Sequence, residues 1–499
     1  MRHSLKTPLP ETTLVVLTLA IFIAGNPTVL AQTDALDRPS AYLLLDGSYL
    51  IDDCPICGRP TIEEPMRGTF NLRLLEQNPL FSRYALENIS FKAGSMRQYT
   101  LKGSGTFQFG GELAVVQEMF LQVEIEDGIT NKLCIFTNSA AVVDRPWPMI
   151  GISLDQTNGT LAQTFTLRLA AAPVREIWFS TVNEFTSAYG QPPANYISPG
   201  DLISSSGRVV KRNQELTARL GIMPSVPDIG LDAVDILPRG EIAFSAEQDE
   251  FSEMFGPLRH GDVLSSRGRI LHRQQDLLAP FIPQPSVPDA GLDAVQELDN
   301  GDLLFSIETN VFSERLAVTL QRGDLLSSAG QLLLSNQQLL ARFHPANVAK
   351  DYGLDAFYVW PHGEIWFSPE EGFQDQMLGP ILPGDLLSNS GYVVFHNLEL
   401  LNAFAPIEDL ADFGLDALFV VTDATPSSPA PRLVSVQPSA STGSVQLAWE
   451  GQGRVFQVES ADVVSGPFLP ISPILPELSF ADLWTLTNRS QAYYRLRQW

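Results

Sequence analysis

Short apolar runs, separated by Gly, Pro, Asn and Asp, dominate the hydrophobic pattern from about residue 42 to the end of the chain. Several of these runs alternate, as in Phe120–Ile125, and others, such as Ile365–Phe367, are apolar on both faces. Alternation is typical of half-buried strands, and continuous apolar runs of this length are typical of strands covered on both sides. Helical spacing is confined to short pairs such as Leu216 and Leu220. The pattern therefore predicts an all-β protein.

One pattern is written four times between about residues 167 and 421. The tetrapeptide Gly-Leu-Asp-Ala begins at Gly230, Gly291, Gly353 and Gly414, at intervals of 61, 62 and 61 residues. A second marker, Gly-Asp followed by two aliphatic residues and Ser, keeps the same intervals from Gly200 onward. Each unit is expected to form a small antiparallel sheet of four short strands, one of which ends in Phe-Ser, and one helical turn that we expect an Asn side chain to cap in three of the four copies.

A sheet built from about 61 residues cannot bury both of its faces alone, so the four units are expected to stack on one another. We favour a ring of sheets, a β-propeller, over an open β-rich array. The strand Leu167–Ala170 stands where a Gly-Leu-Asp-Ala strand would precede the first unit, and the last such strand has no unit after it. We expect these two spare strands to close the ring.

The rest of the chain divides around the repeats. Residues 40–160 contain about eight alternating or apolar runs and predict a β-sandwich or barrel. Residues 161–422 hold the repeats. Residues 423–431 are rich in Pro, Ser and Ala and are interpreted as an extended linker. Residues 432–499 predict a small C-terminal sandwich.

The C-terminal segment carries Trp449, the strand Phe456–Glu459 and the strand Tyr493–Leu496. With this spacing it resembles a fibronectin type III or immunoglobulin-like module. The whole chain resembles a group of secreted bacterial repeat proteins in Asp53-Cys54-Pro55, in Trp178-Phe179-Ser180 and in the Gly-Leu-Asp-Ala series. That resemblance implies an exported location and this domain layout, and it implies no activity.

The first 31 residues have the features of an export signal. Basic residues precede an apolar run over 14–24, and Val29-Leu30-Ala31 fits a cleavage site after Ala31. The apolar run is shorter than a membrane span needs, and the alternative is an uncleaved anchor. We expect an exported protein, periplasmic, on the cell surface or extracellular, with no stable membrane span after cleavage. The formal net charge of −25 disfavours nucleic acid as a partner, because phosphate backbones would be repelled.

The chain has three cysteines, Cys54, Cys57 and Cys134. A metal knuckle at Cys54-Pro55-Ile56-Cys57 would need four ligands, and a thioredoxin-type motif would stand at the start of a helix. In an oxidising compartment two of the three thiols are expected to form a structural disulfide. Cys54 with Cys57 is the local pairing, and Cys134 with either of them is the long-range pairing.

Carboxylates recur at a fixed phase around the repeated glycine. Each unit reads Asp-x-Gly-x-Asp, and such paired oxygens are the start of a calcium loop. The further ligands of a full loop are not repeated, so the alternative is that these side chains cap turns by accepting backbone N–H groups. The candidate ligands are Asp228, Asp232, Asp289, Asp293, Asp351, Asp355, Asp412 and Asp416. Calcium is the one cofactor that this pattern suggests.

Catalytic motifs are not apparent: the sequence has no Gly-x-Ser-x-Gly elbow, no His-Glu-x-x-His and no phosphate loop. The prominent acids are repeated in every unit, whereas a glycosidase needs two carboxylates in unlike surroundings. We therefore name no catalytic residue and expect a non-catalytic binding or scaffold protein for extracellular carbohydrate or protein. The alternatives are a hydrolase acting on extracellular polysaccharide and a structural component of the envelope.

Overall fold

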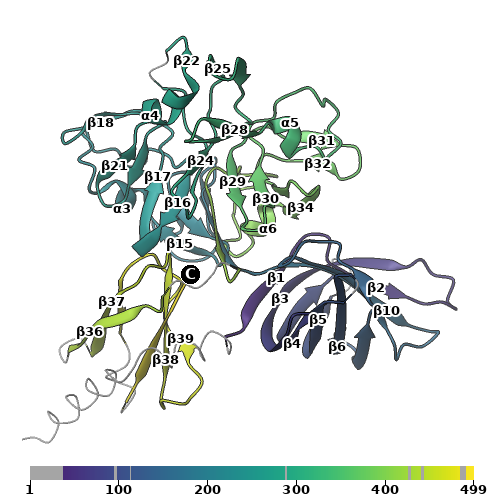
Figure 1. Ribbon diagram of the computed structural model, residues 1–499. Coiled ribbons are helices and arrows are strands. Elements are labelled where there is room, and N and C mark those ends of the chain that lie inside the picture. The colour runs from purple at the N-terminus through teal and green to yellow at the C-terminus, as the bar shows by residue number, and fades with distance from the viewer. Residues whose placement is uncertain are drawn as a thin grey trace, which may run out of the picture.

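The computed structural model describes residues 38–94, 98–112, 114–286, 289–424, 429–439, 443–483 and 491–499. Strands dominate these residues and helices are few and short, so the all-β prediction is confirmed. Figure 1 shows an N-terminal barrel, a ring of small sheets and a C-terminal module. The export signal expected over residues 1–31 lies outside the described residues. None of the described helices is long and apolar enough to cross a membrane.

The N-terminal domain is a closed antiparallel barrel. Strand β10 pairs with β2 on one edge and with β9 on the other, so that eight strands, β2 to β7 with β9 and β10, form a ring. Along β6, exposed and buried residues alternate strictly, and the buried ones fill the interior. The strands are β1 (Ser40–Leu44), β2 (Tyr49–Asp53), β3 (Ile62–Gln77), β4 (Phe81–Ala93), β5 (Tyr99–Gly110), β6 (Val116–Glu126), β7 (Asn131–Thr137), β8 (Ala141–Val142), β9 (Ile150–Gln156) and β10 (Thr164–Ala172).

The last barrel strand corrects one expectation. Leu167–Ala170, which we expected to serve as a spare strand of the repeat ring, lies in β10 and closes the barrel. Leu167, Leu169 and Ala171 point into the barrel core, whereas Ala170 and Ala172 pack against the repeat domain. Both faces of β10 are covered only over residues 169–172, and this end of the strand is as apolar as a repeat strand. The barrel therefore extends to Ala172, beyond the expected boundary at residue 160.

The four repeats form four four-stranded sheets arranged as in a four-bladed propeller. The innermost strands β35, β16, β23 and β29 contact one another in a closed circle around the axis. From the innermost strand outward the blades are β35 (Leu418–Thr422), β11 (Val174–Phe179), β14 (Leu202–Ser204), β15 (Arg208–Lys211); β16 (Val234–Leu237), β17 (Glu241–Phe244), β20 (Val263–Ser265), β21 (Arg269–His272); β23 (Val295–Glu297), β24 (Leu303–Phe305), β27 (Leu325–Ser327), β28 (Gln331–Leu334); and β29 (Ala356–Val359), β30 (Ile365–Ser368), β33 (Leu386–Ser388), β34 (Tyr392–Phe395).

The ring is closed by one strand from the end of the repeat region. Strand β35 pairs with β11, so the first blade takes its innermost strand from the far end of the domain. A cycle of side-chain hydrogen bonds runs the same way around the ring: the serine of each Phe-Ser pair donates its hydroxyl to the leucine carbonyl of the next blade's Gly-Leu-Asp-Ala. The four bonds are Ser180 to Leu231 (2.7 Å), Ser245 to Leu292 (2.9 Å), Ser306 to Leu354 (2.9 Å) and Ser368 to Leu415 (3.0 Å).

Small hairpins and helices complete each blade. A hairpin joins the second strand to the third, and a short helix follows the fourth. The repeated Asn is the first residue of its helix, and its side chain bonds the Gly-Leu-Asp-Ala loop instead of capping the helix, as between Asn213 and Gly230. These elements are β12 (Phe185–Thr186), β13 (Tyr196–Ile197), β18 (Glu250–Ser252), β19 (Gly256–Leu258), β22 (Pro283–Gln284), β25 (Val311–Ser313), β26 (Val318–Leu320), β31 (Phe373–Asp375), β32 (Gly379–Ile381), α3 (Asn213–Thr217), α4 (Gln274–Leu278), α5 (Asn336–Leu339), α6 (Asn397–Leu400), η2 (Pro238–Gly240) and η3 (Ala279–Phe281).

The C-terminal module consists of two three-stranded sheets, β36-β37-β40 and β39-β38-β41. Trp449, Phe456 and Val458 lie in the core between them. This is a small sandwich, and its membership of the fibronectin type III or immunoglobulin-like class stays a prediction. The strands are β36 (Arg432–Ser439), β37 (Ser444–Glu450), β38 (Phe456–Ala461), β39 (Leu469–Pro470), β40 (Ser479–Asp482) and β41 (Tyr493–Gln498).

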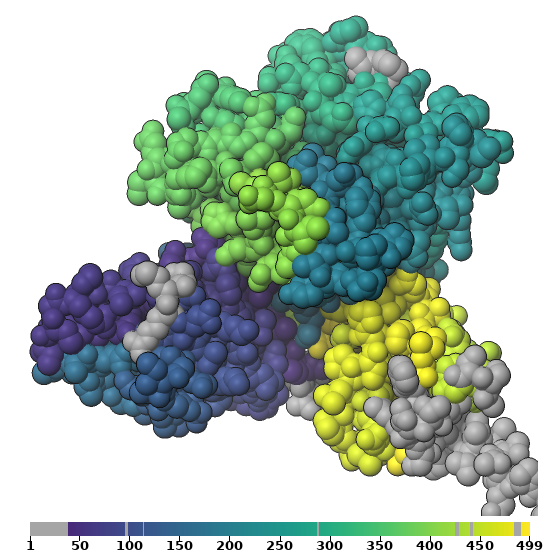
Figure 2. All heavy atoms as spheres, turned by 180° about the vertical axis from the view of Figure 1, so that it is seen from behind, coloured from purple at the N-terminus to yellow at the C-terminus, as the bar shows by residue number. Residues whose placement is uncertain are grey.

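Asp423, the first residue of the expected linker, is a buried junction of all three parts. Its carboxylate accepts hydrogen bonds from the backbone N–H of Ala41 in the barrel (2.8 Å) and from Arg175 in the first blade (2.9 Å). Arg497 (2.7 Å) and Trp499 (2.6 Å) of the C-terminal module donate to the same carboxylate. Figure 2 shows the barrel and the module each packed against the propeller. The three parts are therefore joined by a charged contact as well as by the chain.

Candidate functional site

Four aspartates from four blades meet at one end of the propeller channel. Asp232, Asp293, Asp355 and Asp416 are the aspartates of the Gly-Leu-Asp-Ala series. Each stands one or two residues before the first residue of an innermost strand. Because the innermost strands form a closed circle, this register brings the four carboxylates together around the axis. We call this end of the channel the acidic mouth.

The four carboxylates of the acidic mouth share one electrostatic environment. Burial first, and then the charges of neighbouring carboxylates, hold the pKa of Asp232, Asp293, Asp355 and Asp416 well above the ordinary value of an aspartate. Oδ2 of Asp232 and Oδ2 of Asp293 are buried and have no hydrogen-bond partner among the described residues. A buried carboxylate oxygen without a donor is costly, and two such oxygens lie within this one cluster.

Three glutamates lie around the four aspartates of the acidic mouth. Glu247, Glu308 and Glu370 each lie two residues after the serine of a Phe-Ser pair, and the first blade has Val182 at this position. These side chains pack directly on the repeated glycine: a Cβ at Gly291 would lie 2.1 Å from Cδ of Glu308. Glycine, with positive φ at all four repeats, leaves the space that the glutamates occupy.

Two of the three glutamates have a cationic partner on the preceding blade. His260 Nε2 lies 3.8 Å from Oε2 of Glu308, and Arg322 Nη1 lies 2.8 Å from Oε1 of Glu370. Both cations occupy the position before the repeated Gly-Asp, where the first blade has Pro199 and the fourth has Pro383. At the boundary between the fourth and first blades, Pro383 replaces the cation and Val182 replaces the glutamate, so both charges are absent. At the boundary between the first and second blades, Pro199 replaces the cation, but Glu247 is present.

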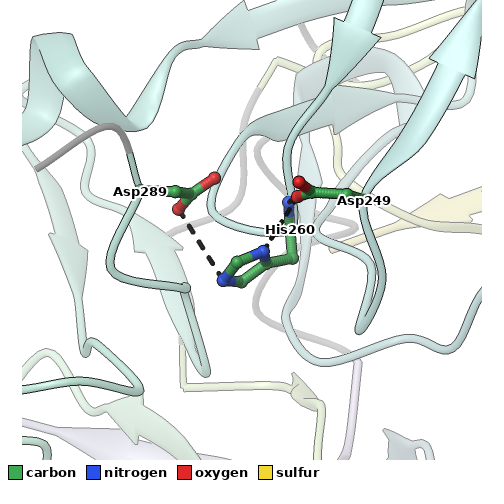
Figure 3. A group of neighbouring side chains, drawn as sticks. All are labelled: Asp249, His260 and Asp289. Carbon is green, nitrogen blue, oxygen red and sulfur yellow. Dashed lines mark hydrogen bonds and ion pairs between the residues drawn. The ribbon is translucent and has the colours of Figure 1, made fainter.

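His260 belongs to a separate cluster at the edge of the mouth (Figure 3). Its Nδ1 lies 2.9 Å from Oδ1 of Asp249, and its Nε2 lies 3.9 Å from Oδ1 of Asp289. Burial lowers the pKa of His260, but the hydrogen bond to Asp249 and the charges of Glu308 and Asp289 outweigh it, so the pKa is raised. Both ring nitrogens face carboxylates, an arrangement that favours the protonated imidazolium.

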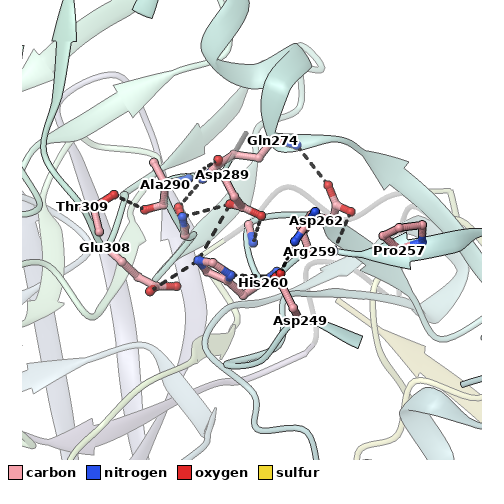
Figure 4. Close-up of polar contacts among 12 residues, drawn as sticks. Asp249, Pro257, Arg259, His260, Asp262, Gln274, Asp289, Ala290, Glu308 and Thr309 are labelled. Carbon is pink, nitrogen blue, oxygen red and sulfur yellow. Dashed lines mark hydrogen bonds and ion pairs between the residues drawn. The ribbon is translucent and has the colours of Figure 1, made fainter. Parts of the chain in front are cut away.

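The other repeated aspartates hold turns. Figure 4 shows Asp289 and Asp262 among their contacts around His260. Asp289 accepts the N–H of Gly291 (3.0 Å) and of Gly261 (3.4 Å), and Asp262 accepts the N–H of Gln274 (3.3 Å). The first aspartate of each Asp-x-Gly-x-Asp makes the same pair of contacts with its own glycine and with the preceding Gly-Asp: Asp228, Asp289, Asp351 and Asp412.

The opposite end of the channel, the covered mouth, is filled by the C-terminal module. Arg454 Nη1 donates to both oxygens of Asp235, at 2.8 and 2.9 Å, and to the carbonyl of Ile236, while Nη2 donates to the carbonyl of Glu297 (2.7 Å). A cavity of about 360 Å³ remains beside this contact, lined by Tyr358, Trp360 and Trp499 among others. This mouth is therefore closed by a neighbouring domain.

The sequence indicated part of this site. The eight aspartates around the repeated glycines were the candidates, and they divide into turn-holding residues and the four residues of the acidic mouth. Glu247, Glu308 and Glu370, with His260 and Arg322, were missed. A signal for them exists, since the glutamate recurs in three of four repeats at the second position after Phe-Ser. Whether this group binds a metal stays a prediction.

The disulfide is the local one. Cys54 and Cys57 are joined, and Cys134 is a buried free cysteine. Burial raises the pKa of the Cys134 thiol. The bond closes a short turn after β2, far in the sequence from the acidic mouth, and Cys134 contributes to the barrel core. All three cysteines therefore belong to the structure of the barrel.

Comparison with known proteins gives little further information. No family model matches the chain, and no curated protein matches it. Among solved structures, the extracellular domain of a hybrid two-component system from B. thetaiotaomicron is 8% identical, covering 90% of this chain and 82% of that one, with a TM-score of 0.21. A second such domain from B. thetaiotaomicron is 7% identical, covering 89% of this chain and 73% of that one, with a TM-score of 0.20. At such TM-scores these likenesses carry no argument about function.

Proposed function

We propose that the protein is an exported, non-catalytic binding protein for an extracellular partner, carbohydrate or protein, and that the propeller face around the acidic mouth receives this partner. The observation that carries the proposal is a set of exposed apolar side chains on the hairpins and loops of this face. Tyr189 is 65% exposed, Met254 66% and Met377 78%, and Phe251 and Phe312 are also exposed. Exposed apolar groups gathered on one face are typical of interaction surfaces.

The chain path puts these hairpins beside the acidic mouth. In the second blade the chain leaves the mouth at Glu247, forms β18 and β19, and returns to its edge at His260. The third blade does the same between Glu308 and Arg322. The covered mouth is occupied by Arg454 and the C-terminal module. The acidic mouth is therefore the end of the propeller at which a partner could reach the channel.

Carbohydrate is the first candidate because of the loop in the first blade. Tyr189 and Tyr196 lie on the connection between β11 and β14, and both are exposed. Tyrosine presents a flat apolar ring with a polar edge, which suits sugar rings that have an apolar face and hydroxyl groups around it. Protein is the second candidate, favoured by Met254 and Met377, because flexible thioether side chains adapt to varied protein surfaces.

The near-equivalence of the carboxylates supports a non-catalytic role. A hydrolase needs one carboxyl group kept protonated and another ionised, in unlike surroundings. Asp232, Asp293, Asp355 and Asp416 instead have pKa values raised by the same two causes, burial and one another. The alternatives remain a polysaccharide hydrolase and a structural component of the envelope, and the experiment below separates all three.

The test is a glycan array with the full-length protein, followed by calorimetric titration of any hit. The double substitution Tyr189→Ala/Tyr196→Ala should weaken glycan binding at least tenfold. The control Ile129→Ala removes an equally apolar side chain, 86% exposed, from the barrel and should change nothing. Glycan binding lost in Phe251→Ala/Met254→Ala instead would place the glycan at the second blade. Turnover of chromogenic glycosides would support the hydrolase, and neither binding nor turnover would support a structural role.

A further inference from the structure

We propose that the acidic mouth binds a hard divalent cation of the calcium type, with Asp232, Glu247 and Asp416 as its ligands and Asp293 and Asp355 completing the surrounding charge. This inference is independent of the partner proposed above, because it concerns what holds the mouth together.

The geometry brings ligand atoms from three chain segments to one point. One carboxylate oxygen from each of Asp232, Glu247 and Asp416 lies within 4.8 Å of the others. Calcium binds oxygen at about 2.3–2.6 Å, so oxygens on opposite sides of one ion are about 4.6–5.2 Å apart. The three oxygens are therefore close enough to share a single ion. Asp232 and Glu247 belong to the second blade and Asp416 to the first, so the ion would bridge two blades.

The second observation is independent of this clustering. Asp293 is 8% exposed, and its Oδ2 is buried with no hydrogen-bond partner among the described residues. Oδ2 of Asp232 is in the same situation. The charges that act most strongly on Asp293 include Glu308, Glu370 and Asp416, which belong to the third, the fourth and the first blade. Asp293 therefore lies among the carboxylates of three blades, where its free oxygen could interact with a bound cation.

The arrangement of cations around the mouth indicates where the ion belongs. Glu308 faces His260 and Glu370 faces Arg322, whereas Glu247 corresponds to Pro199 and makes no ion pair or hydrogen bond within the described part of the chain. Where Pro383 replaces the cation in the fourth blade, Val182 replaces the glutamate. Cation and glutamate are thus present together or absent together at three of the four blade boundaries. The fourth boundary, with Glu247, lacks only the positive charge.

The chemistry of the ligands selects the kind of ion. All the groups named are carboxylates, which suit hard cations such as calcium, whereas zinc prefers nitrogen and sulfur. The nearby imidazole of His260 is engaged with Asp249 and faces Glu308. Magnesium demands near-ideal octahedral geometry and keeps most of its water, so a site built from side chains of two blades favours calcium over magnesium.

The experiment uses the full-length protein treated with EGTA and dialysed. Calcium chloride is then added in a calorimetric titration, and Tm is measured with and without calcium. We expect saturable binding at one site per chain and a rise in Tm of several degrees, with a weaker response to magnesium. Asp232→Asn/Asp416→Asn should abolish both effects, and Glu247→Gln, a change at the solvent-exposed rim, should weaken binding at least tenfold. Asp249→Asn, in the His260 cluster, should leave binding unchanged.

The variants also separate loss of the site from loss of folding. In EGTA, Asp232→Asn/Asp416→Asn should have a higher Tm than the native protein, because the substitution removes like charges that repel one another. A native protein whose Tm is the same in EGTA and calcium and that releases no heat on titration would overturn the proposal and would mean that protons alone hold the carboxylates together. Binding retained in Asp232→Asn/Asp416→Asn but lost in Asp249→Asn would overturn it too, by moving the site to the His260 cluster.

Discussion

The two mouths of the propeller channel are built on the same four strands, but their buried charges have different surroundings. At the acidic mouth the four blades contribute the same residue, aspartate. Three residues further along, at the covered mouth, the equivalent positions hold Asp235, Gln296, Tyr358 and Phe419, which are all different. Carboxylates repeated in neighbouring blades can share a small cation, whereas a group of unlike residues can receive a single side chain. The covered mouth receives Arg454.

Asp235 in β16 and Asp232 just before this strand show the difference between the two mouths. Both are at least largely buried, but Asp235 accepts two bonds from Arg454, one from the N–H of Ile236 (2.8 Å) and one from the N–H of Glu297 (2.8 Å). Oδ2 of Asp232 has no partner among the described residues. A fully bonded buried carboxylate is explained by the fold it stabilises. A buried carboxylate oxygen without a hydrogen bond requires another explanation. The acidic mouth contains several such oxygens among the described residues.

The largest effect is expected from opening the covered mouth. Arg454→Ala leaves Asp235, whose side chain is 3% exposed, without its cation. Breaking a buried pair in this way costs about 3–5 kcal/mol, because the remaining charge stays buried. Chemical denaturation should show this loss. The control is Arg432→Ala, which breaks an ion pair with Glu450 between side chains that are 75% and 68% exposed and should cost less than about 1 kcal/mol. Equal costs would mean that Arg454 does not stabilise the buried charge.

A matched pair of glycines tests the packing of the two mouths. Gly291 has φ +72 and its added Cβ would meet Glu308, whereas Gly301, in the turn after β23, has φ +82 and open space. Gly301→Ala should cost about 1–2 kcal/mol for the left-handed backbone alone. Gly291→Ala should cost about 1–3 kcal/mol more, because Glu308 must move. Denaturation curves of both variants give the difference. Equal losses would show that Glu308 moves freely and does not pack on the glycine.

A second buried carboxylate on the covered side, Asp423, gives a test by pH. Burial alone would raise its pKa, but Arg175 and Arg497 outweigh burial and lower it. Its stabilising contribution is therefore complete above the unfolded pKa of about 3.9 and is lost as the pH falls through the lower folded value. Asp423→Asn should cost about 1.5–3 kcal/mol at pH 7, the size of a charged hydrogen bond. The difference in stability from the native protein should shrink below about pH 4. A difference that is constant from pH 7 to pH 3 would contradict this account.

The repeats were predictable because each blade must bury two faces. The continuous apolar strand Ile365–Phe367 and the fixed spacing of Gly-Leu-Asp-Ala both follow from that requirement. The distinction between Asp289 and Asp293 was not predictable, because the two stand on opposite sides of the turn at Gly291 and point to different surroundings. Asp289 turns back to the N–H groups of Gly261 and Gly291, and Asp293 enters the channel.

Contacts between distant segments were also beyond the sequence pattern. The end of strand β10, over residues 169–172, is apolar on both faces because it touches the barrel core and the propeller, and an apolar strand next to a repeat resembles part of it. Arg454 stands in an ordinary turn between β37 and β38, and nothing local marks it as the residue that enters the channel. Asp423 was assigned to a linker by its neighbours in sequence, whereas its partners come from three domains.

The smallest effect is expected at the cycle of serines that links neighbouring blades at the acidic mouth. Ser306→Ala leaves the carbonyl of Leu354 without its hydroxyl donor in a fully buried setting, which should cost about 1–2 kcal/mol. Ser180→Ala should cost more, because the hydroxyl of Ser180 also accepts the N–H of Ala417 (2.9 Å) at the closing strand β35. The two variants, compared by chemical denaturation, measure whether the acidic mouth is as symmetric in energy as it is in sequence. If Ser306→Ala lowers the free energy of unfolding more than Ser180→Ala does, the serine hydrogen bond at the boundary closed by β35 is not the one that stabilises the ring most.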